Sequence, residues 1–378
     1  MTQDASSIIQ SIDLAQVTAV ARQAAGRDAL QIREWRIDQL GGGLGNPVSV
    51  GLYRFAGVGE DGGEPVSWSA VLKILQSPAN AGWVNMGEGD DPSHWNYWQR
   101  EPLIYQSGLL DTLPAGMAAP HCYGSVNLPG NFILLWLEDI HDAYQTPWPL
   151  ARYALTARHL GEFNGRNASG GARPSFPWFG RQISRQWAAF LPHWRAIPWE
   201  HPRLLQRYPR PEVNSFRRLL LDIDRFLDEL DRLPQTVCHG DTYPTNFMSR
   251  YLPDGREQTV ALDWALMSVD PLGADLGQLV FGAQTNLPTV SREEVTNTLF
   301  AHYLDGLRQS GCRFDPQQVR FGFTAFAALR IGLFQLFLLG EQINQSDLPE
   351  DMEGAPTAVP ECFEVMMAAE ACALWAEM

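Results

Sequence analysis

The segment with the strongest chemical signal has the sequence VCHGDTYPTNF and covers residues 237–247. Asp241 and Asn246 are five residues apart in it, and Pro244 stiffens the loop between them. A carboxylate can accept the proton of a hydroxyl group, and an amide oxygen can bind a hard cation. Taken alone, a His-Gly-Asp turn is more often a structural cap, so the residues around it decide its meaning.

A predicted β-hairpin follows this loop and sets its geometry. Two strand-like segments, 247–252 and 257–262, flank a PDGR turn, and Asp-Gly is a favoured pair in tight turns. Folding the hairpin symmetrically about the centre of this turn sets Asn246 opposite Asp263, and directly opposed residues have Cα atoms about 4.5–5.5 Å apart. The sequence therefore predicts that both side chains bind one Mg²⁺ ion, with Asp241 nearby.

A glycine-rich loop and a lysine precede this region and are suited to phosphate binding. The sequence GGGLGNP contains Gly42, Gly43 and Gly45, where the backbone can approach a phosphate closely. Lys73 lies in the apolar run VLKIL, where an unpaired charge is costly. Glycine-rich turns are common, and a lysine can extend outward from an edge strand. The order of loop, lysine and catalytic segment nevertheless favours a nucleotide site.

The elements that must position these groups differ between the two parts of the chain. With 378 residues, the protein is long enough for two lobes. We predict an α+β fold with an antiparallel-sheet lobe at 1–137 and a mainly helical lobe at 138–378, which contains the hairpin. Strands are expected at 33–40, 48–56, 67–75 and 131–137, and helices at 13–26, 97–109, 149–167, 181–195, 211–233, 291–309, 316–341 and 360–377.

Composition restricts the compartment and the partners. The net charge of −15 disfavours nucleic acid as a partner and suits either a cationic small molecule or simple solubility. Five cysteines without a CxxC motif suggest neither a disulfide framework nor a zinc site. The N-terminus lacks the pattern of a signal peptide, and the apolar stretch 321–339 contains Arg330 and Gln335. We therefore expect a cytoplasmic protein without a membrane span, and the sequence carries no signal for an oligomeric state.

The motifs together resemble a known family. HGDTYPTNF followed by ALDWA is similar to the catalytic loop and metal-binding motif of the aminoglycoside phosphotransferase and choline kinase group, which has the protein-kinase-like fold. The resemblance covers residues 33–279 and is more specific in its C-terminal half. Tyr243 stands where many members have histidine, and Trp264 follows the metal-binding aspartate where protein kinases have phenylalanine. Neither departure removes a chemical group from the reaction.

The resemblance implies roles for the residues of the C-terminal half. Asp241 would orient or deprotonate the acceptor hydroxyl, and Asn246 and Asp263 would hold Mg²⁺. His239 would support the loop from within. Asp275, a carboxylate at a helix N-terminus, would tie that helix back to the catalytic loop.

The resemblance also implies a nucleotide site. Lys73 would contact the α- and β-phosphates, with Glu101 on the following helix as its carboxylate partner. The sequence LWLED resembles the hinge between the lobes, where backbone groups near Trp136, Leu137 and Glu138 would bind the adenine edge. Backbone recognition of this kind fits ATP or GTP.

The implied activity is Mg²⁺-dependent transfer of a phosphoryl group from ATP to a hydroxyl of a small molecule. An antibiotic such as an aminoglycoside, and with it antibiotic resistance, is the favoured interpretation. A choline/ethanolamine-type or other metabolite kinase is an open alternative. A nucleotide-binding pseudokinase is a second alternative, although Lys73, Asp241, Asn246 and Asp263 are all intact. The lack of an A-P-E-like segment after Asp263 disfavours a protein kinase.

Overall fold

The computed structural model describes most of the chain and divides it into two compact units. The first unit comprises Met1–Ala143 and Met248–Leu266, and the second comprises Tyr144–Phe247 and Met267–Met378. The predicted phosphate-binding residues Gly42, Gly43 and Gly45 lie outside the described residues. The described residues are 5–41, 46, 48–81, 90–144, 147–169, 174–187, 197–207, 210–332, 343 and 363–377.

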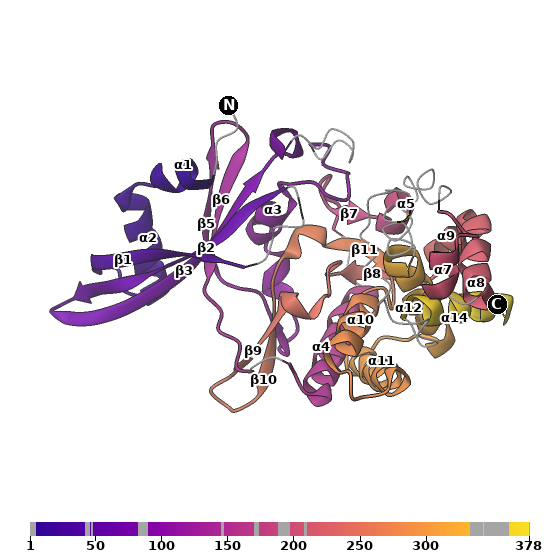
Figure 1. Ribbon diagram of the computed structural model, residues 1–378. Helices are drawn as coiled ribbons and strands as arrows, with labels where there is room; N and C mark the ends of the chain where they lie inside the picture. Colours follow the sequence, from indigo (N-terminus) through magenta and orange to yellow (C-terminus); the bar gives the residue numbers. More distant parts are fainter. Residues whose placement is uncertain are drawn as a thin grey trace. The chain divides into compact units, whose positions relative to one another are not determined.

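The first unit is built on a five-stranded sheet in which all neighbouring strands are antiparallel (Figure 1). The antiparallel sheet was predicted, but its fifth strand, at 122–128, was not. The order of its strands is β1-β2-β3-β6-β5. Lys73 on the central strand lies opposite Leu52 on one neighbour and Leu135 on the other. The strands are β1 (Gln31–Leu40), β2 (Ser49–Asp61), β3 (Glu64–Gln76), β5 (Cys122–Leu128) and β6 (Phe132–Glu138).

Helix α2 (Leu14–Ala25) packs on this sheet because its apolar residues recur at helical spacing. Asp13 caps its N-terminus by accepting a hydrogen bond from the backbone of Gln16 at 2.7 Å. Gly26 ends the helix in the left-handed conformation, with a φ of 62°. Val17 joins the buried cluster that strands β2, β3 and β6 form beneath it.

Helix α3 (Arg100–Gln106) is shorter than predicted. The sequence predicted a helix over 97–109 in which Pro102 imposes a kink or marks the start. The structure begins the helix at Arg100, so Pro102 lies in the first turn, where its missing N–H has no helical partner to lose. The remaining elements of this unit are α1 (Ala5–Gln10), η1 (Pro78–Ala81), η2 (Leu109–Thr112), β4 (Met117–Ala118), β10 (Glu257–Ala261) and η5 (Trp264–Leu266), together with most of β9 (Phe247–Tyr251).

The hairpin between β9 and β10 is present, but its register differs from the predicted one. Leu252 donates its backbone N–H to the carbonyl of Arg256 at 2.8 Å, and Gly255 donates to Leu252 at 2.9 Å. These bonds close a three-residue loop in which Gly255 is left-handed, with a φ of 82°. Leu252 therefore pairs with Arg256, one residue away from symmetric folding about the turn. The register argument that set Asn246 opposite Asp263 is thus wrong, and the expectation that they share an ion rests on the family resemblance.

The second unit is mainly helical, as predicted, with a small three-stranded sheet of order β7-β11-β8. The helix predicted at 211–233 is divided in two at Asp222. The helix predicted at 316–341 begins at Pro316 and becomes a π-helical turn at Ala328. The elements are α4 (Leu150–Ala168), β7 (Gly180–Arg181), α5 (Ile183–Trp187), α7 (Pro202–Arg207), α8 (Arg210–Leu221), α9 (Ile223–Arg232), β8 (Gln235–Cys238), η4 (Pro244–Asn246), β11 (Ser268–Pro271), α10 (Leu276–Asn286), α11 (Arg292–Gln309), α12 (Pro316–Ala327), η6 (Ala328–Gly332) and α14 (Phe363–Glu377).

Glycines allow the longest helices of this unit to pack closely. A Cβ atom on Gly161 of α4 would collide with the backbone of Tyr303 on α11, and one on Gly306 of α11 would collide with the backbone of Arg158 on α4. Within the described parts of the chain, no helix is long and apolar enough to cross a bilayer. For the apolar stretch 321–339, the described part up to Gly332 forms buried helix in this unit.

Candidate active site

A buried ion cluster occupies the first unit. The Lys73 Nζ lies 2.7 Å from Glu101 Oε2 and 2.8 Å from Asp263 Oδ1. Lys73 is 6% exposed and Glu101 is 1% exposed, so water cannot replace either partner. The pairing of Lys73 with Glu101 is the one that the sequence predicted, and it is confirmed as a contact.

Three elements bring these side chains together. Lys73 extends from β3, Glu101 lies in the first turn of α3, and Asp263 follows the end of β10. Asp263 has a φ of 55°, an uncommon conformation for a residue with a side chain, and such strain tends to be kept at functional sites. The buried guanidinium of Arg100 links α3 to the segment after Asp263, because it donates to the carbonyl oxygens of Trp95 at 2.6 Å and Ala265 at 3.2 Å.

The charges of this cluster shift one another. Burial by itself would lower the pKa of Lys73, but Asp263 and Glu101 outweigh that effect and hold the pKa above its ordinary value. Burial raises the pKa of Glu101, and the nearby ammonium of Lys73 opposes the rise. Lys73 is therefore a cation held between two carboxyl groups.

A second cluster holds Asp241 in the second unit. The Asn246 Nδ2 donates to Asp241 Oδ2 at 2.9 Å and to the Asp241 backbone carbonyl at 3.0 Å. The Gln278 Nε2 donates to Asp241 Oδ1 at 3.1 Å. The structure thus brings together Asp241 and Asn246, which the sequence singled out, and adds Gln278, which it did not.

The N-terminus of α10 grips the loop that carries Asp241. The Asp275 carboxylate accepts hydrogen bonds from the backbone N–H groups of His239 at 2.9 Å and Gly240 at 3.0 Å. The tie between Asp275 and the catalytic loop was predicted, and these bonds confirm it. The buried amide of Asn164 donates to the same carboxylate at 2.9 Å, and no sequence argument found that residue. Asn164 is one of several polar residues on the buried face of α4, so its type and position alone did not single it out.

The predicted hinge residues lie at the end of β6. The Trp136 side chain is 1% exposed and packs edge-on against Phe55, with ring centroids 4.7 Å apart. It therefore belongs to the sheet core, and only its backbone can contact a nucleotide. Leu137 is 8% exposed. Just beyond it, Asp139 forms a two-bond ion pair with Arg54 of β2, at 2.8 and 3.0 Å.

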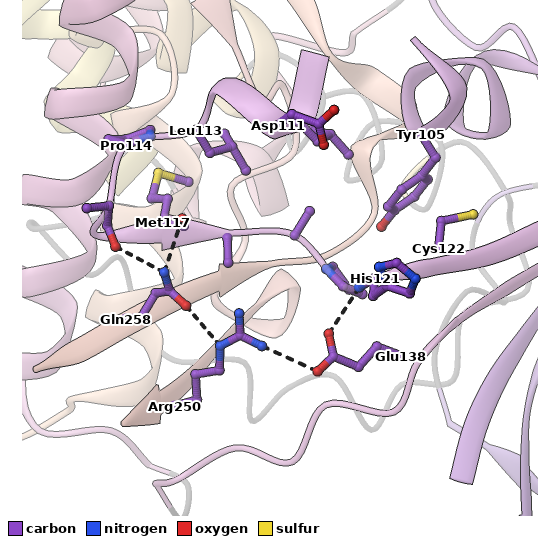
Figure 2. Close-up of a pocket in the computed structure, with 15 residues that line it drawn as sticks. Tyr105, Asp111, Leu113, Pro114, Met117, His121, Cys122, Glu138, Arg250 and Gln258 are labelled. Atoms are coloured by element: carbon purple, nitrogen blue, oxygen red, sulfur yellow. Dashed lines mark hydrogen bonds and ion pairs between the residues drawn. The ribbon is translucent and has the colours of Figure 1, made fainter. Parts of the chain in front are cut away.

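The Glu138 side chain faces a different feature, a cavity of about 540 Å³ within the first unit. Figure 2 shows a polar chain along its wall, in which Arg250 bonds Gln258 at 2.9 Å and Glu138 at 3.3 Å. Glu138 also accepts the backbone N–H of His121 at 3.0 Å. These side chains satisfy one another's hydrogen-bonding groups. Their bonds connect β6, the hairpin and the segment before β5 along this wall of the cavity.

The donor atoms predicted for Mg²⁺ have the right chemistry. The Asn246 Nδ2 is engaged by Asp241, which leaves the amide oxygen as the atom that can coordinate a cation. Asp263 supplies a carboxylate, and both are the hard oxygen donors that Mg²⁺ prefers. Asn246 and Asp263 belong to different units, and their joint coordination stays a prediction. In the described residues, no group of three or more His, Cys, Asp or Glu side chains is placed to hold a metal.

Comparison with known proteins finds a matching family model. Residues 138–321, just under half of the chain, match the model of the phosphotransferase enzyme family. The chain is a phosphotransferase that resembles this family over that segment. The matched segment of the phosphotransferase contains the Asp241 loop, Asp263 and Asp275. The resemblance inferred from these motifs is therefore confirmed.

Solved structures agree on the fold of the phosphotransferase. An amicoumacin kinase, hAmiN, in complex with AMP-PNP, Ca²⁺ and Ami, is 13% identical with a TM-score of 0.50, over 99% of this chain and 96% of that chain. A choline kinase from Cryptosporidium parvum Iowa II is 13% identical with a TM-score of 0.51, over 97% of this chain and 96% of that one. The predicted α+β, protein-kinase-like fold is confirmed. Among curated proteins, no sequence matches this phosphotransferase.

One sequence signal for the site was overlooked. Lys73 is the only lysine in the chain, so the other members of the 28 Lys and Arg residues are all arginine. Arginine has a planar, forked head, whereas lysine places a compact charge at one point. A single lysine retained at a buried position thus pointed to Lys73 more strongly than the apolar strand around it did.

Proposed function

We propose that this phosphotransferase transfers the γ-phosphoryl group of ATP, or GTP, to a hydroxyl group of a small molecule in the presence of Mg²⁺. The observation that best supports the proposal is the Asp241 carboxylate, held by amide donors on both of its oxygens. A carboxylate fixed in this way can accept a proton from a hydroxyl without first reorienting.

The proposed reaction transfers one phosphoryl group and one proton. The acceptor hydroxyl oxygen forms a bond to the γ-phosphorus, the bond from that phosphorus to the bridging oxygen of the nucleotide breaks, and the hydroxyl proton passes to Asp241. Lys73 stabilises the charge on the nucleotide phosphates, and Glu101 keeps Lys73 in place. Asn246 and Asp263 would bind Mg²⁺, which supplies charge neutralisation for the phosphates. Nucleotide and a divalent cation are also named for the amicoumacin kinase that shares this fold.

The acceptor is proposed to be a hydroxylated amine. The net charge of −15 favours a cationic molecule over an anionic one. An antibiotic such as an aminoglycoside and a choline- or ethanolamine-like metabolite both meet this description. The fold does not favour either class, because an amicoumacin kinase and a choline kinase resemble the chain to the same degree.

The test is an ATP-consumption screen over aminoglycosides, other hydroxylated antibiotics, choline, ethanolamine and related amino alcohols. We expect consumption that requires one acceptor and a divalent cation, with one phosphate added to that acceptor by mass. A chelator should stop the reaction, and added Mg²⁺ should restore it. Nucleotide binding without turnover on any acceptor would overturn the proposal and favour the pseudokinase alternative.

A further inference from the structure

Gln278 stands between the catalytic loop and helix α10. It is the third residue of α10 and is 6% exposed. Its Oε1 accepts the backbone N–H of Thr242 at 2.8 Å, and its Nε2 donates to Asp241 Oδ1 at 3.1 Å. One amide thus contacts two consecutive residues of the loop with opposite hydrogen-bonding roles.

The chemistry of the contacts fixes which end of the amide faces which partner. A backbone N–H can only donate, so the Gln278 atom facing Thr242 must be the oxygen. The NH₂ group then has to face the Asp241 carboxylate. The hydrogen bond from Thr242 thereby ensures that Asp241 faces the NH₂ group of Gln278.

The start of α10, which carries Gln278, is itself hydrogen-bonded to the loop. Asp275, three residues earlier and on the same face of α10, accepts the N–H groups of His239 and Gly240. The four residues that follow Cys238, from His239 to Thr242, are therefore all hydrogen-bonded to Asp275 or Gln278 at the start of α10. Gln278 cannot move away from Asp241 without breaking bonds to the backbone of the loop.

We propose that Gln278 is a positioning residue that sets the orientation of the Asp241 carboxylate. Asn246 holds one carboxylate oxygen and Gln278 holds the other, so rotation of the carboxylate breaks at least one hydrogen bond. This inference deepens the proposed function and rests on it, because the orientation matters only if Asp241 accepts a proton. If Gln278 only accepted the Thr242 N–H and did not orient Asp241, its replacement would have a different effect.

The substitution Gln278→Glu separates the two readings. A carboxylate oxygen can still accept the Thr242 N–H, so the structural bond remains. The NH₂ group that donates to Asp241 is lost. A carboxylate oxygen, negatively charged like Asp241 itself, takes its place. The matched control is Gln284→Glu, because Gln284 is also a buried glutamine of α10 but donates to Arg292 and Thr296 instead of the loop.

For Gln278→Glu we expect kcat to fall by about 10- to 100-fold, the cost of a misplaced catalytic group, with the KM for nucleotide changed by less than about twofold. Lowering the pH should recover part of the loss, because a protonated carboxyl at position 278 can donate to Asp241. Gln284→Glu should keep kcat close to the wild-type value. Equal kcat values for Gln278→Glu and wild type, or an equal loss in both variants, would overturn the proposal.

A crystal structure of the Gln278→Glu variant keeps the inference distinct from the proposed function. We expect the Asp241 carboxylate to rotate away from position 278 while the Thr242 backbone stays in place. An unmoved carboxylate contradicts the positioning role whatever the activity. If wild type turns over no acceptor but the carboxylate rotates, the proposed function fails and the positioning of Asp241 by Gln278 stands.

Discussion

The two clusters of the phosphotransferase hold their aspartates by opposite means. In the first unit, Asp263 lies against the ammonium of Lys73, which Glu101 also contacts. In the second unit, the hydrogen bonds described for the Asp241 carboxylate come from the neutral amides of Asn246 and Gln278. The described contact of the Asp263 carboxylate is thus with a cation, whereas the described hydrogen bonds of the Asp241 carboxylate come from neutral amides.

The difference follows from what each group has to do. A buried ammonium is costly unless carboxylates surround it, so Lys73 depends on its partners for its charge. A general base needs a fixed orientation and a lone pair for the incoming proton, and a close cation would oppose protonation. Neutral amides orient Asp241 without a formal positive charge of their own. The comparison predicts that the first cluster is sensitive to charge balance and the second to geometry.

The largest expected effect comes from removing the base. Asp241→Asn keeps the size of the side chain and removes its ability to take up a proton. We expect kcat to fall by about 100- to 10,000-fold, with nucleotide affinity and melting temperature close to wild type. The measurement is phosphorylated product formed at saturating nucleotide and acceptor. Turnover at the wild-type rate would remove Asp241 from the reaction.

The next effect tests charge balance in the first cluster. Lys73→Met leaves the carboxyl of Glu101 buried without its cation, and we expect the free energy of unfolding to fall by about 3–5 kcal/mol. Adding Glu101→Gln to that variant removes the uncompensated charge and should recover part of the stability. Chemical denaturation of the two variants and wild type measures this. A double variant no more stable than Lys73→Met would contradict the account of the cluster as an ion network.

A smaller effect tests the geometry of the second cluster. A Cβ atom on Gly282 of α10 would collide with the ring of Pro244 in the catalytic loop. Gly282→Ala should therefore cost about 1–3 kcal/mol of stability through overpacking and should lower kcat by displacing the loop. Gly255→Ala, in the hairpin turn and away from any neighbouring atom, is the control for stability lost without a shift of the loop. Full activity in Gly282→Ala would show that the loop tolerates displacement.

The smallest effect concerns a buried carboxyl outside both clusters. Burial raises the pKa of Asp270 from 3.8 to about 7, while a hydrogen bond from Ser268 opposes the rise. The folded state then keeps a proton that the unfolded state releases between those values, so Asp270 costs stability increasingly as the pH rises toward 7. The gain in melting temperature from Asp270→Asn should grow by a few degrees between about pH 5 and about pH 8. A gain independent of pH would contradict the shifted titration.

Much of the fold could be predicted because its signals are local. The strands β3 and β6 follow apolar runs, and β2 follows an alternating pattern, although β2 and β3 extend beyond the predicted ranges. Asp13 and Gly26 mark the ends of α2. The short strands β8 and β11 were missed because a run of four residues carries too little pattern to separate strand from loop. The hairpin was predicted with the wrong register, because one left-handed glycine decides whether a PDGR loop has three residues or two.

The sequence by itself determined the chemistry of this protein: a carboxylate and an amide on one stiff loop, an aspartate after a hairpin, and a single lysine in an apolar strand. Side-chain type and spacing along the chain are enough for that. Only the tertiary structure decided that Asp263 also contacts Lys73, and that Gln278 reaches Asp241 at 3.1 Å. The physical reason is that hydrogen bonds and ion pairs act over about 3 Å, whereas their partners stand tens of residues apart, so packing alone selects them.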